Sequence, residues 1–281
     1  AKTKTMSQTL LIRSRIMDFS RPLVMGIVNV TPDSFACRCA SMDEPGVMAV
    51  AGALVQQGAD ILDIGACSTR PGSEPVSADE EWRRLDMALG CIKKAFPDSI
   101  LSVDTFRAEI AERAIEKYEA DIINDVSGLS DEGMLPLLSR AHVPYILTHP
   151  AGACARWDEQ TDVMSDMLTF FSFRMDELHR AGVKDVILDP GLGFGKTLEQ
   201  NYHILMHLNQ LAVLDCPVMV GLSRKSMIYK ALNTDPMHAL NGTTAAHVVA
   251  LMQGASVLRV HDVREAKEVI KIVDYCTKNK E

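Results

Sequence analysis

Three polar segments in the last third of the chain carry the residue types best suited to chemistry. They read Asp189-Pro-Gly-Leu-Gly-Phe-Gly-Lys-Thr197, Ser223-Arg-Lys225 and Arg259-Val-His-Asp262. Each follows a short apolar run and precedes a helix-like stretch, so each is expected at the carboxyl end of a strand. Packing gives no reason to place charged side chains there. In an α/β barrel those ends converge on one mouth, where active sites are built. The segments therefore predict an active site.

A second group of polar side chains ends other strand-like runs. Asp104, Asn124, Asp189 and Lys225 form a coherent set, because two carboxylates can accept from ring N–H and amino groups while Asn and Lys can donate. That set suits a flat heterocycle with an aminopyrimidinone edge. A single Asp or Asn at a strand end is often only a cap for the next helix. Capping alone does not explain polar residues at nearly every strand end.

Arg259 and His261 are two residues apart, so both point the same way if the strand continues that far. Arg binds phosphate through two hydrogen bonds, and the helix expected from Asp262 adds backbone donors. Asn29 ends the first strand, which neighbours the eighth in a closed barrel. The sequence thus predicts an anion site built from both ends of the chain. The alternative is a plain ion pair between Arg259 and a nearby carboxylate such as Asp262.

The elements that must position these residues alternate along the chain. Buried strands without period-two alternation, followed regularly by amphipathic helices, predict parallel strands covered by helices. Eight such units favour a single (β/α)₈ TIM barrel over residues 21–281, with residues 1–20 as a peripheral extension. The expected strands are Leu23–Val28, Asp60–Ile64, Ile100–Val103, Asp121–Ile123, Pro144–Leu147, Val186–Leu188, Val218–Val220 and Val257–Val260. The expected helices are Gly46–Gln57, Ala78–Ala95, Arg107–Tyr118, Glu132–Ala141, Thr161–Ala181, Leu198–Asn209, Gly242–Gln253 and Arg264–Lys278.

Glycines mark two further features. Gly58, Gly182 and Gly254 stand just ahead of expected strands, where a left-handed glycine would end the preceding helix. The run from Gly191 to Thr197 resembles a P-loop, but Pro190 stands where the first glycine is required, which argues against ATP binding. Its glycines instead predict a loop that passes close to a flat ligand, with Phe194 against it.

Two early connections, Thr31-Pro-Asp-Ser-Phe35 and Ser68-Thr-Arg-Pro-Gly72, are rich in turn formers. Loops at a barrel mouth often close over substrate, although plain surface turns are the alternative.

Bulk composition limits the function. A length of 281 residues fits one barrel, and a net charge of −8 argues against a nucleic-acid groove. Seven irregularly spaced cysteines predict free thiols in a reducing cytoplasm. We expect neither a signal peptide nor a membrane span.

Seven stretches of the chain, in order from about Pro22 to Val273, resemble the dihydropteroate synthase family. They are Asn29-Val-Thr-Pro-Asp-Ser-Phe35, Asp63-Ile-Gly65 with Ser68-Thr-Arg-Pro-Gly72, Ser102-Val-Asp-Thr105, Ile123-Asn-Asp-Val-Ser-Gly128, Asp189 to Thr197, Ser223-Arg-Lys-Ser226 and Arg259-Val-His-Asp262. The resemblance implies condensation of 6-hydroxymethyl-7,8-dihydropterin diphosphate with 4-aminobenzoate, giving 7,8-dihydropteroate and diphosphate. It also implies Mg²⁺ near Asn29 and a homodimer.

The resemblance also implies roles for individual residues. Asp104, Lys225, Arg259 and His261 would act in catalysis. The pterin would be held by Asp104, Asn124, Asp189 and Lys225, and the diphosphate by Asn29, Arg259 and His261. The aminobenzoate pocket would be shaped by Phe35, Thr69, Pro71, Phe194 and Ser223, and the remaining substrate contacts would come from Asp33, Arg70, Thr148 and Gly221.

This chain departs from the family pattern in both early loops. Gly65-Ala-Cys67 replaces the usual Gly-Gly-Glu, and Ala36-Cys-Arg-Cys39 replaces Ser-Asp-Gly-Gly. Both departures fall in the early loops, so they bear on loop dynamics, turnover and the response to sulfonamide analogues. They leave the pterin and anion residues unchanged. Two rival functions are a corrinoid-dependent pterin methyltransferase, which needs no diphosphate site, and a catalytically silent paralogue.

Overall fold

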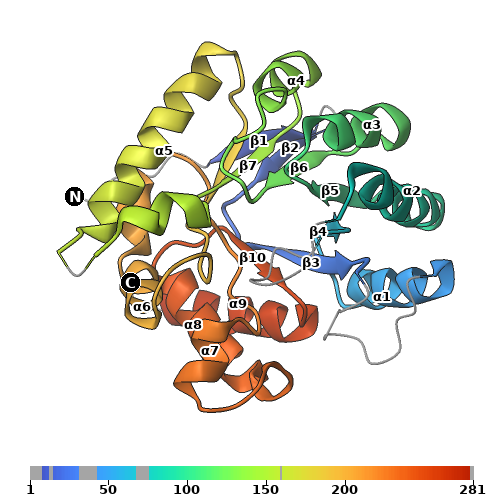
Figure 1. Ribbon diagram of the computed structural model, residues 1–281. Coiled ribbons are helices and arrows are strands. Elements are labelled where there is room, and N and C mark those ends of the chain that lie inside the picture. The colour runs from blue at the N-terminus through green and yellow to red at the C-terminus, as the bar shows by residue number, and fades with distance from the viewer. Residues whose placement is uncertain (1–7, 13–14, 32–42, 68–75, 159, 279–281) are drawn as a thin grey trace.

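A ring of helices surrounds parallel strands in the computed structural model of this chain (Figure 1). The structure describes residues 8–12, 15–31, 43–67, 76–158 and 160–278. Within them no helix is long and apolar enough to cross a membrane.

Eight parallel strands form the inner wall. Their order in the sheet is β8-β7-β6-β5-β4-β3-β10-β9. A bridge between Leu188 and Val218 links the two outer strands, and the Leu188 N–H donates to the Pro217 carbonyl at 2.9 Å. The sheet thereby closes into the expected TIM barrel. Its strands are β3 (Leu23–Asn29), β4 (Ile61–Gly65), β5 (Ile100–Asp104), β6 (Ile122–Asp125), β7 (Tyr145–Thr148), β8 (Val186–Asp189), β9 (Met219–Val220) and β10 (Val257–Val260).

All eight expected helices are confirmed to within a few residues. The helix expected over Leu198–Asn209 ends at Met206 and continues as a 3₁₀ turn, and the helix-like stretch expected after Lys225 is the short helix α7. The α-helices are α1 (Glu44–Gln56), α2 (Ala78–Ala95), α3 (Ala108–Tyr118), α4 (Met134–Ala141), α5 (Val163–Arg180), α6 (Leu198–Met206), α7 (Ser226–Ala231), α8 (Leu240–Met252) and α9 (Val263–Lys278). The 3₁₀ turns are η1 (Ala151–Arg156), η2 (Leu208–Leu214) and η3 (Pro236–His238).

Helix α2 shows why these segments are helical. The Ser77 side chain caps its first turn by accepting from the Glu80 N–H, and acidic residues fill that turn while two lysines fill the last. Leu85, Leu89 and Ile92 lie at helical spacing and are fully buried. Burying each such side chain stabilises the fold by about 1.5–3 kcal/mol.

The predicted glycine stops are also confirmed. Gly58, Gly182 and Gly254 have φ of 91°, 84° and 96°, the left-handed region that ends a helix without strain in glycine.

The inside of the barrel has an apolar lower layer and a polar upper layer. Side chains two apart on a strand share a face, and five buried apolar residues of the lower layer each have a polar residue above them, toward the carboxyl end. The pairs are Ile61 and Asp63, Ile122 and Asn124, Ile146 and Thr148, Ile187 and Asp189, and Val257 and Arg259. The strands therefore deliver the polar residues to one end.

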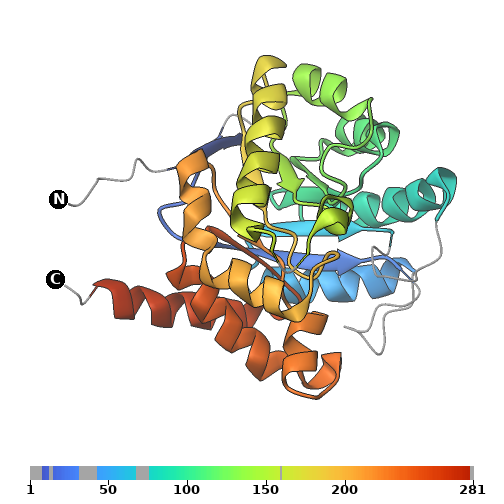
Figure 2. The ribbon, with the colours of Figure 1, turned by 60° about the vertical axis from the view of Figure 1, so that its left-hand side comes forward.

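A short hairpin closes the other end, which we call the base. Strands β1 (Thr9–Ile12) and β2 (Arg15–Asp18) pair antiparallel outside the barrel sheet. Leu10 and Ile12 are only 3% and 4% exposed and pack against the lower layer of the barrel. In Figure 2 the hairpin lies on the opposite side from the arrowheads of β3 and β4. Part of the predicted extension is thus a plug for the base.

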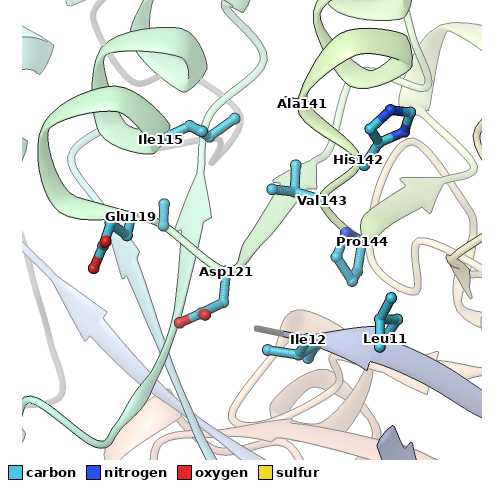
Figure 3. A pocket seen from close by; sticks show the side chains of 10 residues that line it. Leu11, Ile12, Ile115, Glu119, Asp121, Ala141, His142, Val143 and Pro144 are labelled. Carbon is cyan, nitrogen blue, oxygen red and sulfur yellow. The ribbon is translucent and has the colours of Figure 1, made fainter. Parts of the chain in front are cut away.

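Two hollows lie outside the polar interior of the barrel. One, of about 380 Å³, lies at the base between the hairpin and the ends of α3 and α4 (Figure 3). Leu11, Ile12, Ile115, Val143 and Pro144 give it a mostly apolar lining. The other, of about 620 Å³, lies between α3 and α4, outside the barrel. Neither contains a predicted pterin residue.

Candidate functional site at the barrel mouth

A hydrogen-bonded network crosses the inside of the barrel at its carboxyl end, which we call the mouth. Arg259 on β10 donates from Nε to Asp63 Oδ2 at 2.6 Å and from Nη2 to Asp104 Oδ2 at 2.7 Å. Asn124 Nδ2 donates to the same Asp63 oxygen at 3.0 Å. The network confirms that Asp104, Asn124 and Arg259 meet at one place although they lie far apart in sequence.

Asp63 is the residue that the site prediction missed. It is fully buried on β4 and joins Arg259 to Asn124. The available signal was its position near the carboxyl end of an apolar run, two residues before the end of β4. A lone buried carboxylate has an ordinary explanation as a helix cap, and its partner on β10 is 196 residues away.

Burial controls the protonation of the two predicted pterin carboxylates. Desolvation raises the pKa of Asp104 to about 7, although the nearby Arg259 charge opposes the rise and Asp63 adds to it. Burial likewise raises the pKa of Asp189, against the opposing effect of Lys225. Buried carboxyls with raised pKa values are typical of a functional site.

Lys225 lies between the carboxylates and the glycine-rich segment. Its Nζ donates to the Leu192 carbonyl at 2.7 Å and lies 4.2 Å from the centre of the Phe194 ring. Burial lowers the pKa of Lys225 to about 8, and Asp189 partly offsets that effect. The structure thus places Asp189, Phe194 and Lys225 together, as predicted.

Three buried polar atoms in this region have no hydrogen-bond partner among the described residues. They are Asp63 Oδ1, Asn124 Oδ1 and Thr148 Oγ1. Buried polar groups are normally satisfied, and leaving one unpaired costs about 1–3 kcal/mol. Three such atoms, on β4, β6 and β7, indicate a site built to bond a ligand.

The side of the mouth predicted to bind an anion is formed by β9 and β10. The His261 N–H donates to Ser223 Oγ at 3.3 Å, and His261 Nδ1 lies 3.1 Å from the same oxygen. Gly221 follows β9, and a Cβ there would lie 3.8 Å from both Lys225 Nζ and Arg259 Cδ. The backbone therefore passes close to both cations, as expected for Gly221.

Arg259 does form the alternative ion pair with nearby carboxylates, but these are Asp63 and Asp104 and not Asp262. Asp262 instead receives two hydrogen bonds of 2.8 Å from Arg224, through Nε and Nη2. Arg259 points into the barrel and Asp262 begins the turn into α9, so their side chains face different partners.

Asn29 ends β3, which pairs with β10 as a closed barrel requires. Among the described residues no group of three or more His, Cys, Asp and Glu side chains could hold a metal ion. Asn29 can supply one side-chain oxygen. Mg²⁺ usually retains several waters and binds few protein ligands together with substrate phosphates, so this donor fits a shared site.

Some predicted residues lie outside the described part of the chain. They are Asp33, Phe35, Thr69, Arg70, Pro71, Cys37 and Cys39. The five described cysteines, Cys67, Cys91, Cys154, Cys216 and Cys276, are free thiols.

The segment before Ser68 carries the Gly65-Ala-Cys67 departure. Arg84 donates to the Ala66 carbonyl at 3.1 Å, and Arg107 Nη1 lies 3.7 Å from Cys67 Sγ while it also bonds Glu81. Burial, reinforced by the Glu81 charge, raises the pKa of Cys67 to about 12. The thiol is therefore unsuited to act as a nucleophile.

Comparison with known proteins places these residues in context. Residues 25–261 match the family described as pterin binding enzymes. The chain is 38% identical over 270 residues to the dihydropteroate synthase of Escherichia coli K12, covering 94% of this chain and 95% of that protein. It also resembles the Xanthomonas albilineans dihydropteroate synthase solved with 4-aminobenzoic acid, at a TM-score of 0.89 and 37% identity, over 97% of this chain and 99% of that one. The Coxiella burnetii enzyme solved with pteroic acid gives a TM-score of 0.89 and 35% identity, over 98% and 100% of the two chains.

Proposed function

This chain belongs to the dihydropteroate synthase family, and we propose that it joins 6-hydroxymethyl-7,8-dihydropterin diphosphate to 4-aminobenzoate, giving 7,8-dihydropteroate and diphosphate. One observation carries the proposal. The mouth combines ionisable carboxyls, an ammonium and a guanidinium with the unpaired atoms Asp63 Oδ1, Asn124 Oδ1 and Thr148 Oγ1. That combination suits a polar heterocycle joined to an anion.

The pterin edge binds to Asp104, Asn124, Asp189 and Lys225. The carboxylates accept from the ring N–H and the exocyclic amino group, while Asn124 and Lys225 donate to ring oxygen and nitrogen. A ligand without this edge would leave buried groups unpaired, which makes the pocket selective.

Substrate binding redistributes the bonds of Arg259. Before substrate arrives, its guanidinium is held by Asp63 and Asp104. An arriving diphosphate can accept two hydrogen bonds from the guanidinium of Arg259, so it competes with the two carboxylates for that group. As Arg259 turns toward the diphosphate, the carboxylate of Asp104 is released to bind the pterin.

The diphosphate binds at Asn29, Arg259 and His261, next to Ser223. We also propose a Mg²⁺ ion shared between Asn29 and the diphosphate oxygens. When bound, it would supply positive charge to the leaving group. The imidazole of His261 and the guanidinium of Arg259 stabilise the same negative charge.

Cleavage of the C–O bond leaves positive charge on the pterin methylene, and the amine of 4-aminobenzoate attacks that carbon. Asp104 and Asp189 stabilise the cationic pterin. This is electrostatic stabilisation and requires no nucleophilic side chain. Phe194 and Ser223 border the amine pocket, which Asp33, Phe35, Thr69, Arg70 and Pro71 would complete.

An assay with both substrates tests the proposed activity. Purified protein with Mg²⁺ should form dihydropteroate and release diphosphate in equal amounts. Diphosphate without dihydropteroate would reveal simple hydrolysis, and the absence of both products would favour a silent paralogue. Lys225→Ala is the matched inactive control.

We further propose that the enzyme works as a homodimer in the cytoplasm. The free thiols suit a reducing compartment. Neighbouring helices α8 and α9 expose Met252 and Ile272, which are 64% and 61% accessible and could pack against a second copy. Sedimentation equilibrium should give twice the chain mass, and substitution of both residues by Glu should shift it toward the monomer.

A further inference from the structure

Lys196 stands where a P-loop would have its phosphate-binding lysine, yet its ammonium donates to three backbone carbonyls of the protein. Nζ donates to the carbonyls of Gly191 at 2.9 Å, Phe194 at 3.2 Å and His149 at 3.4 Å. An ammonium has three N–H donors, so these carbonyls match its full capacity. The lysine is partly buried, and burial lowers its pKa.

The three carbonyls belong to two strand ends. His149 follows β7, whereas Gly191 and Phe194 lie in the segment 190–197 after β8, which we call the glycine loop. A Cβ on Gly195 would lie 3.0 Å from the Ala151 backbone. The glycine loop is therefore pressed against η1, and Lys196 ties it to that support.

The glycine loop also carries two groups that face the substrates. The Leu192 carbonyl accepts from Lys225 Nζ, and the Phe194 ring lies beneath the same ammonium. Leu192 lies between Gly191 and Phe194, and Lys196 donates to the carbonyls of both. If Lys225 turns to the pterin, the Leu192 carbonyl loses its donor. The bonds from Lys196 to the carbonyls on either side then hold this part of the loop, together with Asn201 Oδ1, which accepts from the Gly193 N–H at 2.6 Å.

From this arrangement we propose that Lys196 is a positioning residue for the reaction: it holds the glycine loop in shape while Lys225 exchanges the Leu192 carbonyl for substrate. This inference rests on the proposed function of the mouth. Lys196 itself touches no reacting atom, and it acts through the placement of Phe194 and Lys225.

The test compares two substitutions at this position. Lys196→Met keeps the length and removes all three donors, whereas Lys196→Gln loses the charge but keeps two N–H donors. Lys184→Met, at an exposed lysine near the base, controls for the loss of a lysine. Each variant is assayed for KM of both substrates, for kcat and for thermal unfolding. Hydrogen exchange is measured at the amides of residues 191–194.

We expect Lys196→Met to remain folded, to exchange faster in the glycine loop and to raise the KM of both substrates by about tenfold or more, since small displacements of positioning groups cost up to ~10²-fold. Lys196→Gln should recover part of that loss because it restores donors. The double variant Lys196→Met with Phe194→Ala should lose less than the product of the two single losses.

The inference is overturned if folded Lys196→Met keeps both KM values within twofold of wild type, or if Lys196→Gln is no better than Lys196→Met. If the wild-type protein forms no dihydropteroate, the proposed function fails instead. The exchange measurement then still decides whether Lys196 holds the loop.

Discussion

The base and the mouth of the barrel are built from the same strands, and their inward-facing side chains are only two residues apart in sequence. The two ends nevertheless differ in chemistry and in role. At the base, Ile61, Ile122 and Ile187 pack with Leu10 and Ile12 of the hairpin in an apolar cluster. The mouth replaces that packing with charges that partly neutralise one another and with unpaired polar atoms. Burying polar groups costs free energy that apolar packing elsewhere must offset. The difference teaches that the base stabilises the barrel so that the mouth can remain poorly satisfied.

The largest effect should come from Arg259→Ala. Removing the guanidinium leaves Asp63 and Asp104 buried without their cation, so unfolding should become easier by about 3–5 kcal/mol. The diphosphate also loses a partner, and we expect kcat/KM to fall by about 10³-fold or more. Chemical denaturation and steady-state kinetics measure the two effects.

The double variant Asp63→Asn with Arg259→Met separates stability from activity, because it removes a buried carboxylate together with its cation. Compared with Arg259→Ala, the double variant should recover part of the lost stability but none of the lost activity. Full activity in Arg259→Ala or in the double variant would show that Arg259 is not part of the active site.

Lys225→Met should show that charges at the mouth are not equivalent. Among the described residues the Lys225 ammonium donates to the Leu192 carbonyl and to no carboxylate, so its loss breaks no hydrogen-bonded ion pair there. We expect kcat/KM to fall about 10²-fold with little change in thermal unfolding. A large loss of stability would place Lys225 with the structural network around Arg259.

The pH dependence should report the two shifted groups. Asp104 has a pKa of about 7 and accepts from the pterin only when ionised, so kcat/KM should rise with pH toward 7, by about tenfold per unit on the acid side. Lys225 has a pKa of about 8 and donates only when protonated, so kcat/KM should fall above that value. Asp104→Asn should abolish the acid limb while leaving the basic limb in place.

The same shift predicts an opposite trend in stability. Burial raises the pKa of Asp104 from 3.8 to about 7 in the folded state. Its contribution to stability is therefore greatest below its ordinary pKa and is lost as pH rises from 3.8 to about 7. Asp104→Asn should be relatively more stable than wild type at pH 7 than at pH 4, as denaturation at the two pH values can measure.

At the base, Ile12→Ala should affect stability alone. Deleting a buried side chain of this size costs about 2–5 kcal/mol, whereas kcat and both KM values should stay at wild-type levels. Leu11→Ala, at a neighbouring residue that is 54% exposed, should change stability by less than about 0.5 kcal/mol. A loss of activity in folded Ile12→Ala would show that base and mouth are coupled.

Most of the barrel could be predicted because its strands are short apolar runs followed by helices of clear period. The hairpin could not, because Leu11 is apolar but exposed and hides the alternation of Leu10 and Ile12. Its burial depends on the assembled base, which no local pattern encodes.

The site was predictable where strand ends determine position, as for Asp104, Asn124, Asp189 and Arg259. It was not predictable where a long-range partner decides, as for Asp63, or where side-chain direction outweighs sequence distance, as for Asp262. The role of Lys196 also needed coordinates, because its acceptors are backbone oxygens from two separate connections.

The alternation of strand and helix has a practical consequence for anyone handling this protein. Helix α9 starts beside Asp262 at the catalytic end and runs to Lys278, far behind it, on the side where the β1–β2 hairpin also sits (Figure 2). A purification handle or carrier domain joined beyond Lys278 would therefore project away from incoming substrate. Immobilisation through that end should leave turnover unchanged.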